Sequence, residues 1–135
     1  MNTASGMISG YLLDSQVLMW LGPDRHKLGA TTNQLLRFRD LYYSTVSIAE
    51  LGFKSQSSKI RFGRNEIEDW VKVGIIELPF GRQAAVEFAS FFSHQVPDPM
   101  DRQIMAVARA NGLGLITADR RILSLKFDWV IDATT

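Results

Sequence analysis

Four acidic side chains are the groups whose type and spacing could carry chemistry: Asp14, Glu50, Asp101 and Asp119. Asp14 and Asp119 each follow a segment that reads as a buried strand, and the other two lie in the first turns of expected helices. Functional crevices of open α/β sheets lie beyond the carboxyl ends of the strands, so we expect these carboxylates to meet at one edge. Such a cluster costs energy unless a cation neutralises it, and oxygen ligands without His or Cys suit Mg²⁺ or Mn²⁺ rather than zinc.

Each acid also has a structural explanation, because acidic side chains stabilise the first turn of a helix. Asp14 and Asp119 suit N-caps. Ser47 and Glu50 match a capping box, in which Glu50 would reach back to the backbone amide of Ser47. Only the constellation of four acids, and no single one of them, favours a metal site.

Asp98 precedes Pro99 and Asp101 in a related arrangement, with a cap, a proline at the first helical position and an acid in the first turn. Asp98 could assist the acidic cluster or cap the helix. We favour the cap.

Hydrophobic periodicity predicts alternating strands and helices along the chain. Short buried strands are expected at residues 7–13, 41–43, 75–78, 114–117 and 127–131. Helices are expected at residues 15–21, 31–39, 48–55, 65–73, 82–94, 99–111 and 119–123. This alternation implies right-handed crossovers, so we predict an α/β fold in one domain: a mainly parallel central sheet of about five strands with helices on both faces.

Composition narrows the function classes. The 135 residues carry a formal net charge of +1, which gives no global basic footprint of the kind seen in non-specific nucleic-acid binders. The sequence has no cysteine, which excludes disulfides and thiolate metal sites and is compatible with the cytoplasm, where we expect the protein to act. No apolar stretch approaches about 20 residues, so we expect no membrane span. Residues 1–6 read as a flexible leader before a domain at 7–135, with Met7 as an alternative start.

The aromatic residues are expected mostly in the core. Trp20, Trp70 and Trp129 fall on buried faces, which makes base stacking a less favoured role. The helix expected at 82–94 would bury a stripe of Ala85, Phe88, Ala89 and Phe92. Phe91 lies off that stripe, so we expect it to be exposed on an oligomer or partner surface.

A series of segments along nearly the whole chain carries a family signature by its order and spacing. They are LLDS at 12–15 with VLMWL at 17–21, STVSIAELGFK at 44–54, SKI at 58–60, DPMDR at 98–102 running into Ala106 and Ala108, and LITAD at 115–119. Together they resemble PIN-domain ribonucleases, specifically the VapC-type toxins of bacterial toxin–antitoxin pairs. The family often has a histidine where this chain has Gln16 and an aromatic residue where it has Met100. Neither position is a metal ligand, so these departures concern the substrate more than catalysis.

The resemblance implies a PIN-like fold and an endoribonuclease that depends on Mg²⁺ or Mn²⁺. Asp14, Asp101 and Asp119 would hold the ion, and Glu50 would ligate it or orient the attacking water as a general base. The residues behind these ligands would be Ser15 and Thr117. The number of carboxylates allows one ion or two.

Cations at the rim of such a pocket would hold the RNA backbone. The candidates are Lys54, Arg102 and Arg120, with Arg121 and the stretch Lys59, Arg61 and Arg64 beside them. Each one taken singly is explained more simply as ordinary surface charge.

The resemblance also implies partners. The substrate would be RNA, commonly transfer or ribosomal RNA, and a small antitoxin protein would cover the active site with its tail. VapC-like proteins generally form homodimers. Their antitoxin supplies DNA binding, so this chain would meet DNA only indirectly.

Three other interpretations stay open. A catalytically silent PIN-like binding module would use the acids only as helix caps, and a housekeeping RNA-processing PIN nuclease would share the chemistry without an antitoxin. A phosphotransfer receiver domain would need an acid pair after its first strand and a lysine ending its last. The chain offers Asp14 with Ser15 and Ile131 with Asp132 at those places, so this third interpretation is the least favoured.

Overall fold

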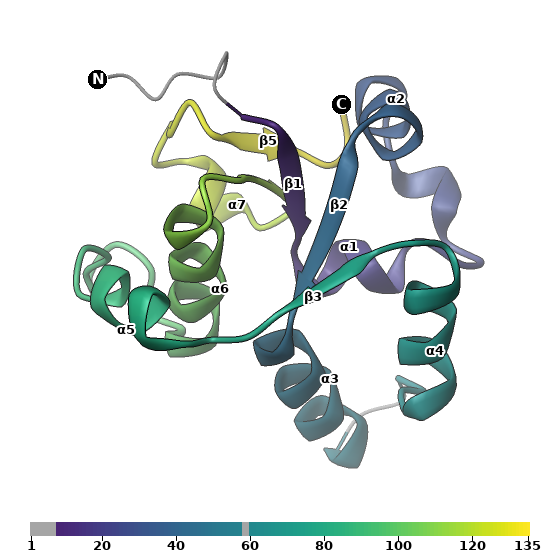
Figure 1. Ribbon diagram of the computed structural model, residues 1–135, viewed down its shortest axis with the longest axis horizontal. Coiled ribbons are helices and arrows are strands. Elements are labelled where there is room, and N and C mark those ends of the chain that lie inside the picture. Colours follow the sequence, from purple (N-terminus) through teal and green to yellow (C-terminus); the bar gives the residue numbers. More distant parts are fainter. Residues whose placement is uncertain (1–7, 58–59) are drawn as a thin grey trace.

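A parallel sheet forms the centre of the computed structural model, which describes residues 8–57 and 60–135. Its strands are β1 (Gly10–Leu13), β2 (Asp40–Ser44), β3 (Ile76–Leu78), β4 (Gly114–Thr117) and β5 (Val130–Asp132). They lie in the order β3-β2-β1-β4-β5 (Figure 1), and every neighbouring pair is parallel. The predicted α/β fold with five parallel strands is therefore confirmed. The expected leader and Met7 lie outside the described residues.

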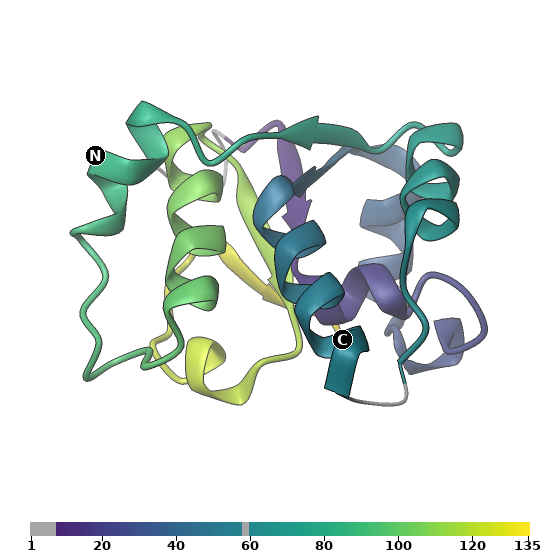
Figure 2. The ribbon, with the colours of Figure 1, turned by 90° about the horizontal axis from the view of Figure 1, so that it is seen from below.

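Helices connect the strands, as parallel pairing requires. They are α1 (Ser15–Met19), the short 3₁₀ helix η2 (Arg25–Lys27), α2 (Ala30–Phe38), α3 (Thr45–Ser57), α4 (Arg64–Lys72), α5 (Arg82–Phe88), α6 (Pro99–Ala110) and α7 (Arg120–Leu123). Helices α3 and α6 lie side by side and contact each other (Figure 2). Helix α5 packs against α6. No helix in the described part of the chain is long and apolar enough to cross a membrane.

Two neighbouring inner strands, β1 and β4, lie in the core of the molecule. All residues of β1 and β4 are buried. Leu12, Leu13, Leu115 and Ile116 have no exposed surface, as expected for strands covered on both faces. The outer strand β3 is more exposed. The segments that carry Asp14 and Asp119 thus follow directly from the most buried strands of the sheet.

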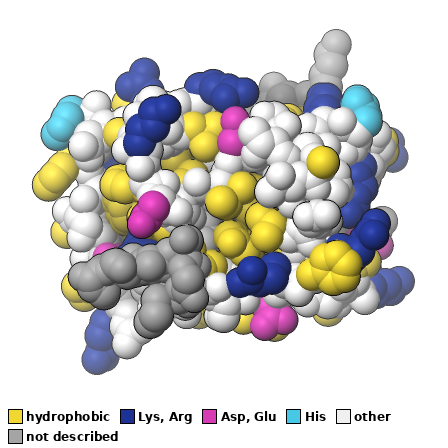
Figure 3. Space-filling view, turned by 90° about the horizontal axis from the view of Figure 1, so that it is seen from above, with side chains coloured by type: hydrophobic (Ala, Val, Ile, Leu, Met, Phe, Trp, Pro, Cys, Tyr) yellow, Lys and Arg dark blue, Asp and Glu magenta, His cyan; other side chains and the backbone are white. Residues whose placement is uncertain are grey.

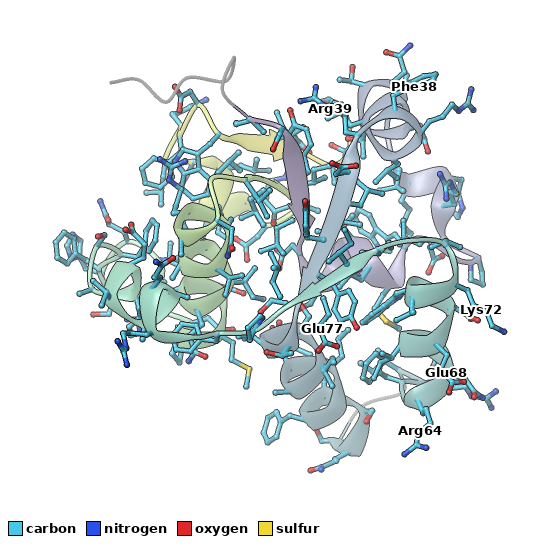
Figure 4. All side chains as sticks on the ribbon, in the orientation of Figure 1. Phe38, Arg39, Arg64, Glu68, Lys72 and Glu77 are labelled. Carbon is cyan, nitrogen blue, oxygen red and sulfur yellow. The ribbon has the colours of Figure 1, made fainter. Side chains whose placement is uncertain are left out.

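Helix α4 shows the amphipathic pattern that the sequence predicts. Its Trp70 is buried and meets the ring of Tyr43 edge to face, with the ring centroids 5.1 Å apart. On the opposite side, Arg64, Glu68 and Lys72 point away from the sheet (Figure 4).

Helix α3 begins earlier than predicted. It starts at Thr45, and the hydroxyl of Ser44 accepts a hydrogen bond from the backbone N–H of Val46 (3.0 Å). Ser47 is therefore a buried residue inside the first turn, and the predicted capping box of Ser47 and Glu50 is wrong. Glu50 lies one turn further into the helix than expected, with its side chain available for other contacts.

Helix α5 ends earlier than predicted, at Phe88, so a helical stripe does not extend to residue 94. Phe91 turns inward, is 8% exposed and packs edge-on against Phe127 and Trp129. The prediction that Phe91 is exposed is therefore wrong. Phe92 is the exposed aromatic residue instead, at 55%, and its ring stacks on His94.

Candidate metal centre

The strand order reverses between β1 and β4, because the chain adds β2 and β3 on one side of β1 and later β4 and β5 on the other. Ligands of open α/β sheets bind beyond the carboxyl ends of the strands at such a reversal. A hollow of about 570 Å³ opens at this place, and we call it the acidic hollow. The structure brings all four sequence-predicted acids into its lining: Asp14, Glu50, Asp101 and Asp119.

Asp14 follows β1 and is 5% exposed. One carboxylate oxygen accepts a hydrogen bond from the backbone N–H of Ser15 (2.8 Å), and the other accepts one from the hydroxyl of Thr117 at the end of β4 (2.5 Å). Burial, together with the smaller effects of the charges of Glu50 and Asp119, raises the pKa of Asp14 to about 6 despite these bonds. This carboxyl group is therefore fixed in position and unfavourably charged.

Glu50 is held by a chain of buried polar groups between α1 and α3. The hydroxyl of Ser15 donates to Glu50 Oε1 (2.6 Å) and lies 2.8 Å from the hydroxyl of Ser47. Since a hydroxyl carries one proton, Ser15 accepts from Ser47 while it donates to Glu50. The other oxygen, Glu50 Oε2, pairs with Lys54 Nζ at 3.1 Å.

Asp98 and Asp101 begin α6. Asp98 caps the helix by accepting a hydrogen bond from the backbone N–H of Met100 (2.9 Å), so the predicted cap is confirmed. Asp98 also belongs to the acidic group, since carboxylate oxygens of Glu50, Asp98 and Asp101 all lie within 4.8 Å of one another. Within residues 8–57 and 60–135, no hydrogen bond reaches the carboxylate of Asp101. Burial raises its pKa to about 8, and the surrounding carboxylates add to this effect.

Asp119 follows β4 and caps α7, accepting hydrogen bonds from the backbone N–H groups of Arg121 (2.8 Å) and Ile122 (3.1 Å). Its own backbone N–H donates to the hydroxyl of Thr117 (3.0 Å). Thr117 thus joins Asp119 to Asp14, because the same hydroxyl donates to the Asp14 carboxylate.

Helix capping accounts for only part of the acidic hollow. It explains Asp98 and Asp119, and Asp14 in part. Glu50 and Asp101 cap no helix. These two acids are buried or half-buried among other carboxylates, an arrangement that costs free energy and that a bound cation would offset.

The three cationic side chains that were predicted to bind the substrate lie in different surroundings. Lys54 lines the acidic hollow, whereas Arg102 and Arg120 are absent from the lining that the described residues form. The guanidinium of Arg102 lies over the ring of Phe88, 5.1 Å from its centroid. The guanidinium of Arg120 is exposed and pairs with Asp132 (3.2 Å).

Two further residues line the acidic hollow, and the sequence gives only a weak signal for either of them. Arg61 lines it and is exposed, and Trp20 lines it while only partly buried. Trp20 also stacks under the ammonium group of Lys27, 5.5 Å from the ring centroid. The signal for Arg61 was its basic stretch, but Arg64 in the same stretch points away from the sheet (Figure 4).

A second hollow of about 440 Å³ adjoins the first, and we call it the apolar hollow. Met19 and Arg61 line both. The apolar side chains in its lining include Leu18, Leu36, Leu41, Trp70 and Ile75. On the face of the molecule seen in Figure 3, the acidic side chains that are visible stand apart from one another.

Comparisons with known proteins agree with this geometry. The family model of the PIN domain matches residues 11–128, which is most of the chain, and the protein therefore belongs to the PIN-domain family. Within this family it is similar to Ribonuclease VapC22 of Mycobacterium tuberculosis, with 31% identity over 121 residues that cover 84% of this chain and 89% of the relative.

Solved structures share the fold. A toxin–antitoxin complex from Klebsiella pneumoniae contains a chain with a TM-score of 0.66 and 16% identity, covering 92% of this chain and 98% of its own. A VapBC-5 structure from Mycobacterium tuberculosis gives a TM-score of 0.59 and 20% identity, covering 91% and 96%. At these identities the likeness concerns the fold alone.

Proposed function

We propose that this protein is a metal-dependent endoribonuclease that acts as the toxin of a toxin–antitoxin pair. The observation that carries this proposal is the convergence of carboxylates from β1, α3, α6 and β4 in one hollow of a PIN domain. The similarity to a ribonuclease of the VapC type supports the same activity. Such a toxin would meet its RNA in the cytoplasm.

The donor set fits a hard divalent cation, because the acids that converge there offer carboxylate oxygens. We assign Asp14, Asp101 and Asp119 as ligands of Mg²⁺ or Mn²⁺, with Glu50 as a further ligand or as the general base. Such an ion, when bound, acidifies water and neutralises charge on the scissile phosphate.

The chain's own residues position these groups. Ser15 orients Glu50 so that it can take a proton from the attacking water, and Thr117 orients Asp14. Ser15 and Thr117 are thus positioning residues behind the ligands. Because they extend from the ends of β1 and β4, the geometry is set before any substrate arrives.

The RNA would approach over the rim of the acidic hollow. Lys54, Arg61 and Trp20 line it and offer two cations and an aromatic ring to phosphates and bases. Arg102 and Arg120 remain proposed contacts for more distant nucleotides. Transfer or ribosomal RNA is the expected substrate class.

An antitoxin is the expected protein partner, and a homodimer the expected assembly. The structures that share this fold include toxin–antitoxin complexes. The apolar hollow supports a place for the antitoxin tail, because it adjoins the acidic hollow and shares the lining residues Met19 and Arg61 with it. A tail with apolar residues followed by a basic residue would match both hollows in turn. This protein would then meet DNA only through the antitoxin.

Cleavage of total RNA by the purified protein tests the activity. We expect discrete fragments with Mg²⁺ or Mn²⁺ and none with EDTA. The double variant Asp14→Asn, Asp101→Asn should give none, whereas Asp69→Asn, an exposed acid at the apolar hollow, should cleave like the wild type. Absence of both cleavage and metal binding in the wild type would instead favour a silent binding module.

Inhibition by the protein encoded beside this chain separates a toxin from a housekeeping nuclease. We expect the neighbouring protein to bind tightly and to stop cleavage. Cleavage that continues in its presence would identify an RNA-processing enzyme instead.

A further inference from the structure

Lys54 places a cation of the protein itself inside the acidic hollow. Its ammonium lies 3.1 Å from Glu50 Oε2, one turn along α3. Its charge also interacts with Asp101 and Asp98. Lys54 therefore pairs with one of the three acids whose oxygens lie within 4.8 Å of one another, and its charge interacts with the other two.

This contact differs from an ordinary surface pair. Glu and Lys four residues apart on a helix commonly pair when both side chains are exposed. Here the side chain of Glu50 is 6% exposed and that of Lys54 is 54% exposed, so the lysine reaches from the surface to a buried carboxylate. A buried carboxylate among like charges needs a counterion far more than an exposed one does.

The acids of the hollow fall into two groups. Asp14 and Asp119 are joined through Thr117 at the ends of β1 and β4. Glu50, Asp98 and Asp101 form the other group, and Asp101 also interacts with the charge of Asp14, so it connects the two groups. Lys54 pairs with Glu50 in this second group. A centre with two divalent ions would place the second ion about 4 Å from the first. An ammonium already at the second group would repel it.

We propose that Lys54 takes the place of a second metal ion, so that this nuclease works with one divalent ion and one tethered ammonium. This inference rests on the proposed function and deepens it. Lys54 then acts at the centre itself, in addition to lining the rim over which the RNA approaches. Its role is to neutralise Glu50 and Asp98, while Asp14, Asp101 and Asp119 hold the single ion.

Counting bound Mn²⁺ by electron paramagnetic resonance and calorimetry tests this proposal without reference to activity. We expect one ion for the wild-type protein and two for Lys54→Met, which keeps most of the aliphatic stem. Lys54→Arg should restore the count of one. Lys72→Met, on the outer side of α4, should also bind one ion (Figure 4).

The outcomes separate this inference from the proposed function. Two ions in the wild type, or one ion in Lys54→Met, would overturn the role of Lys54 and leave the metal-dependent nuclease intact. No bound ion in any variant would overturn both. Thermal unfolding of each variant without metal shows whether it is folded, and Lys54→Leu serves as the second variant if Lys54→Met is not.

Discussion

The acidic hollow and the apolar hollow adjoin each other but differ in their buried side chains, which are carboxylates in the first and apolar core residues in the second. In the first, burial and mutual repulsion raise the pKa of Asp14 to about 6 and that of Asp101 to about 8. In the second, Trp70 and Ile75 are 5% and 4% exposed and contribute to the core. The comparison shows that burial lowers the stability of the fold at the acidic hollow and raises it at the apolar hollow.

Among the variants, Asp101→Asn should show the difference between the two hollows most clearly. We expect RNA cleavage to fall at least about 100-fold, because a proposed ligand of the ion is lost. Without metal, the free energy of unfolding near pH 8 should rise by about 1 kcal/mol, since a half-buried charge among like charges disappears. Cleavage assays and urea unfolding measure the two effects. A variant that lost both activity and stability would contradict this assignment.

Ile75→Ala should have the reverse effect. Truncation of this buried side chain at the apolar hollow should lower the free energy of unfolding by about 3 kcal/mol. The affinity for Mn²⁺ should stay unchanged, because the acids are attached to other elements. Calorimetric titration at a temperature where the variant is folded checks this. A parallel loss of metal affinity would show that the two hollows are not independent.

The stability of the metal-free protein should fall as pH rises. The folded-state pKa values of Asp14 and Asp101 lie above the ordinary value of 3.8, so the folded state keeps protons that the unfolded chain has lost. Their stabilisation is complete below about pH 4 and is lost as pH rises through about 6 and about 8. We expect a decrease of several kcal/mol, at most about 5 kcal/mol, between pH 5 and pH 8.5.

Urea unfolding with EDTA across this range measures the slope. Added Mn²⁺ should reverse it, and Asp101→Asn should flatten it. A free energy of unfolding that increased with pH over the same range would show that the carboxylates are not destabilising in the folded state.

Thr117→Val should produce the smallest of these effects. It removes the hydrogen bond to Asp14 while keeping the shape of the side chain. We expect the affinity for Mn²⁺ to fall about tenfold with little change in fold, as for other groups that orient metal ligands. Thr31→Val, at an exposed position of α2, is the matched control. Equal affinities for Mn²⁺ in the two variants would show that Thr117 does not orient a metal ligand.

The fold was predictable because its signals are local. The buried runs of β1 and β4 and the helical spacing of α4 and α6 stand in the sequence. The acids at the strand ends could be found by the same means, since parallel strands bring their carboxyl ends to one edge. Contacts between distant elements were less accessible. The inward turn of Phe91 depends on Phe127 and Trp129, and the position of Arg102 depends on the ring of Phe88.

Another wrong prediction, the start of α3, arose because the sequence allows two local arrangements. Ser44 and Ser47 are equally good caps by residue type, and only the end of β2 decides where α3 begins. That choice determines whether Glu50 serves the helix or the acidic hollow. Lys54 could be predicted near the site from its spacing to Glu50. Its approach to Asp98 and Asp101 depends on the packing of α3 against α6.

The buried chain of Ser47, Ser15 and Glu50 has a consequence for sequence variation. Each member satisfies the next, so a change at one position leaves a buried polar group without its partner. Single substitutions at these positions should therefore be rare among relatives that keep the activity. In relatives that no longer cleave RNA, we expect all three residues to be substituted. These three positions would then distinguish PIN domains that cleave RNA from those that do not.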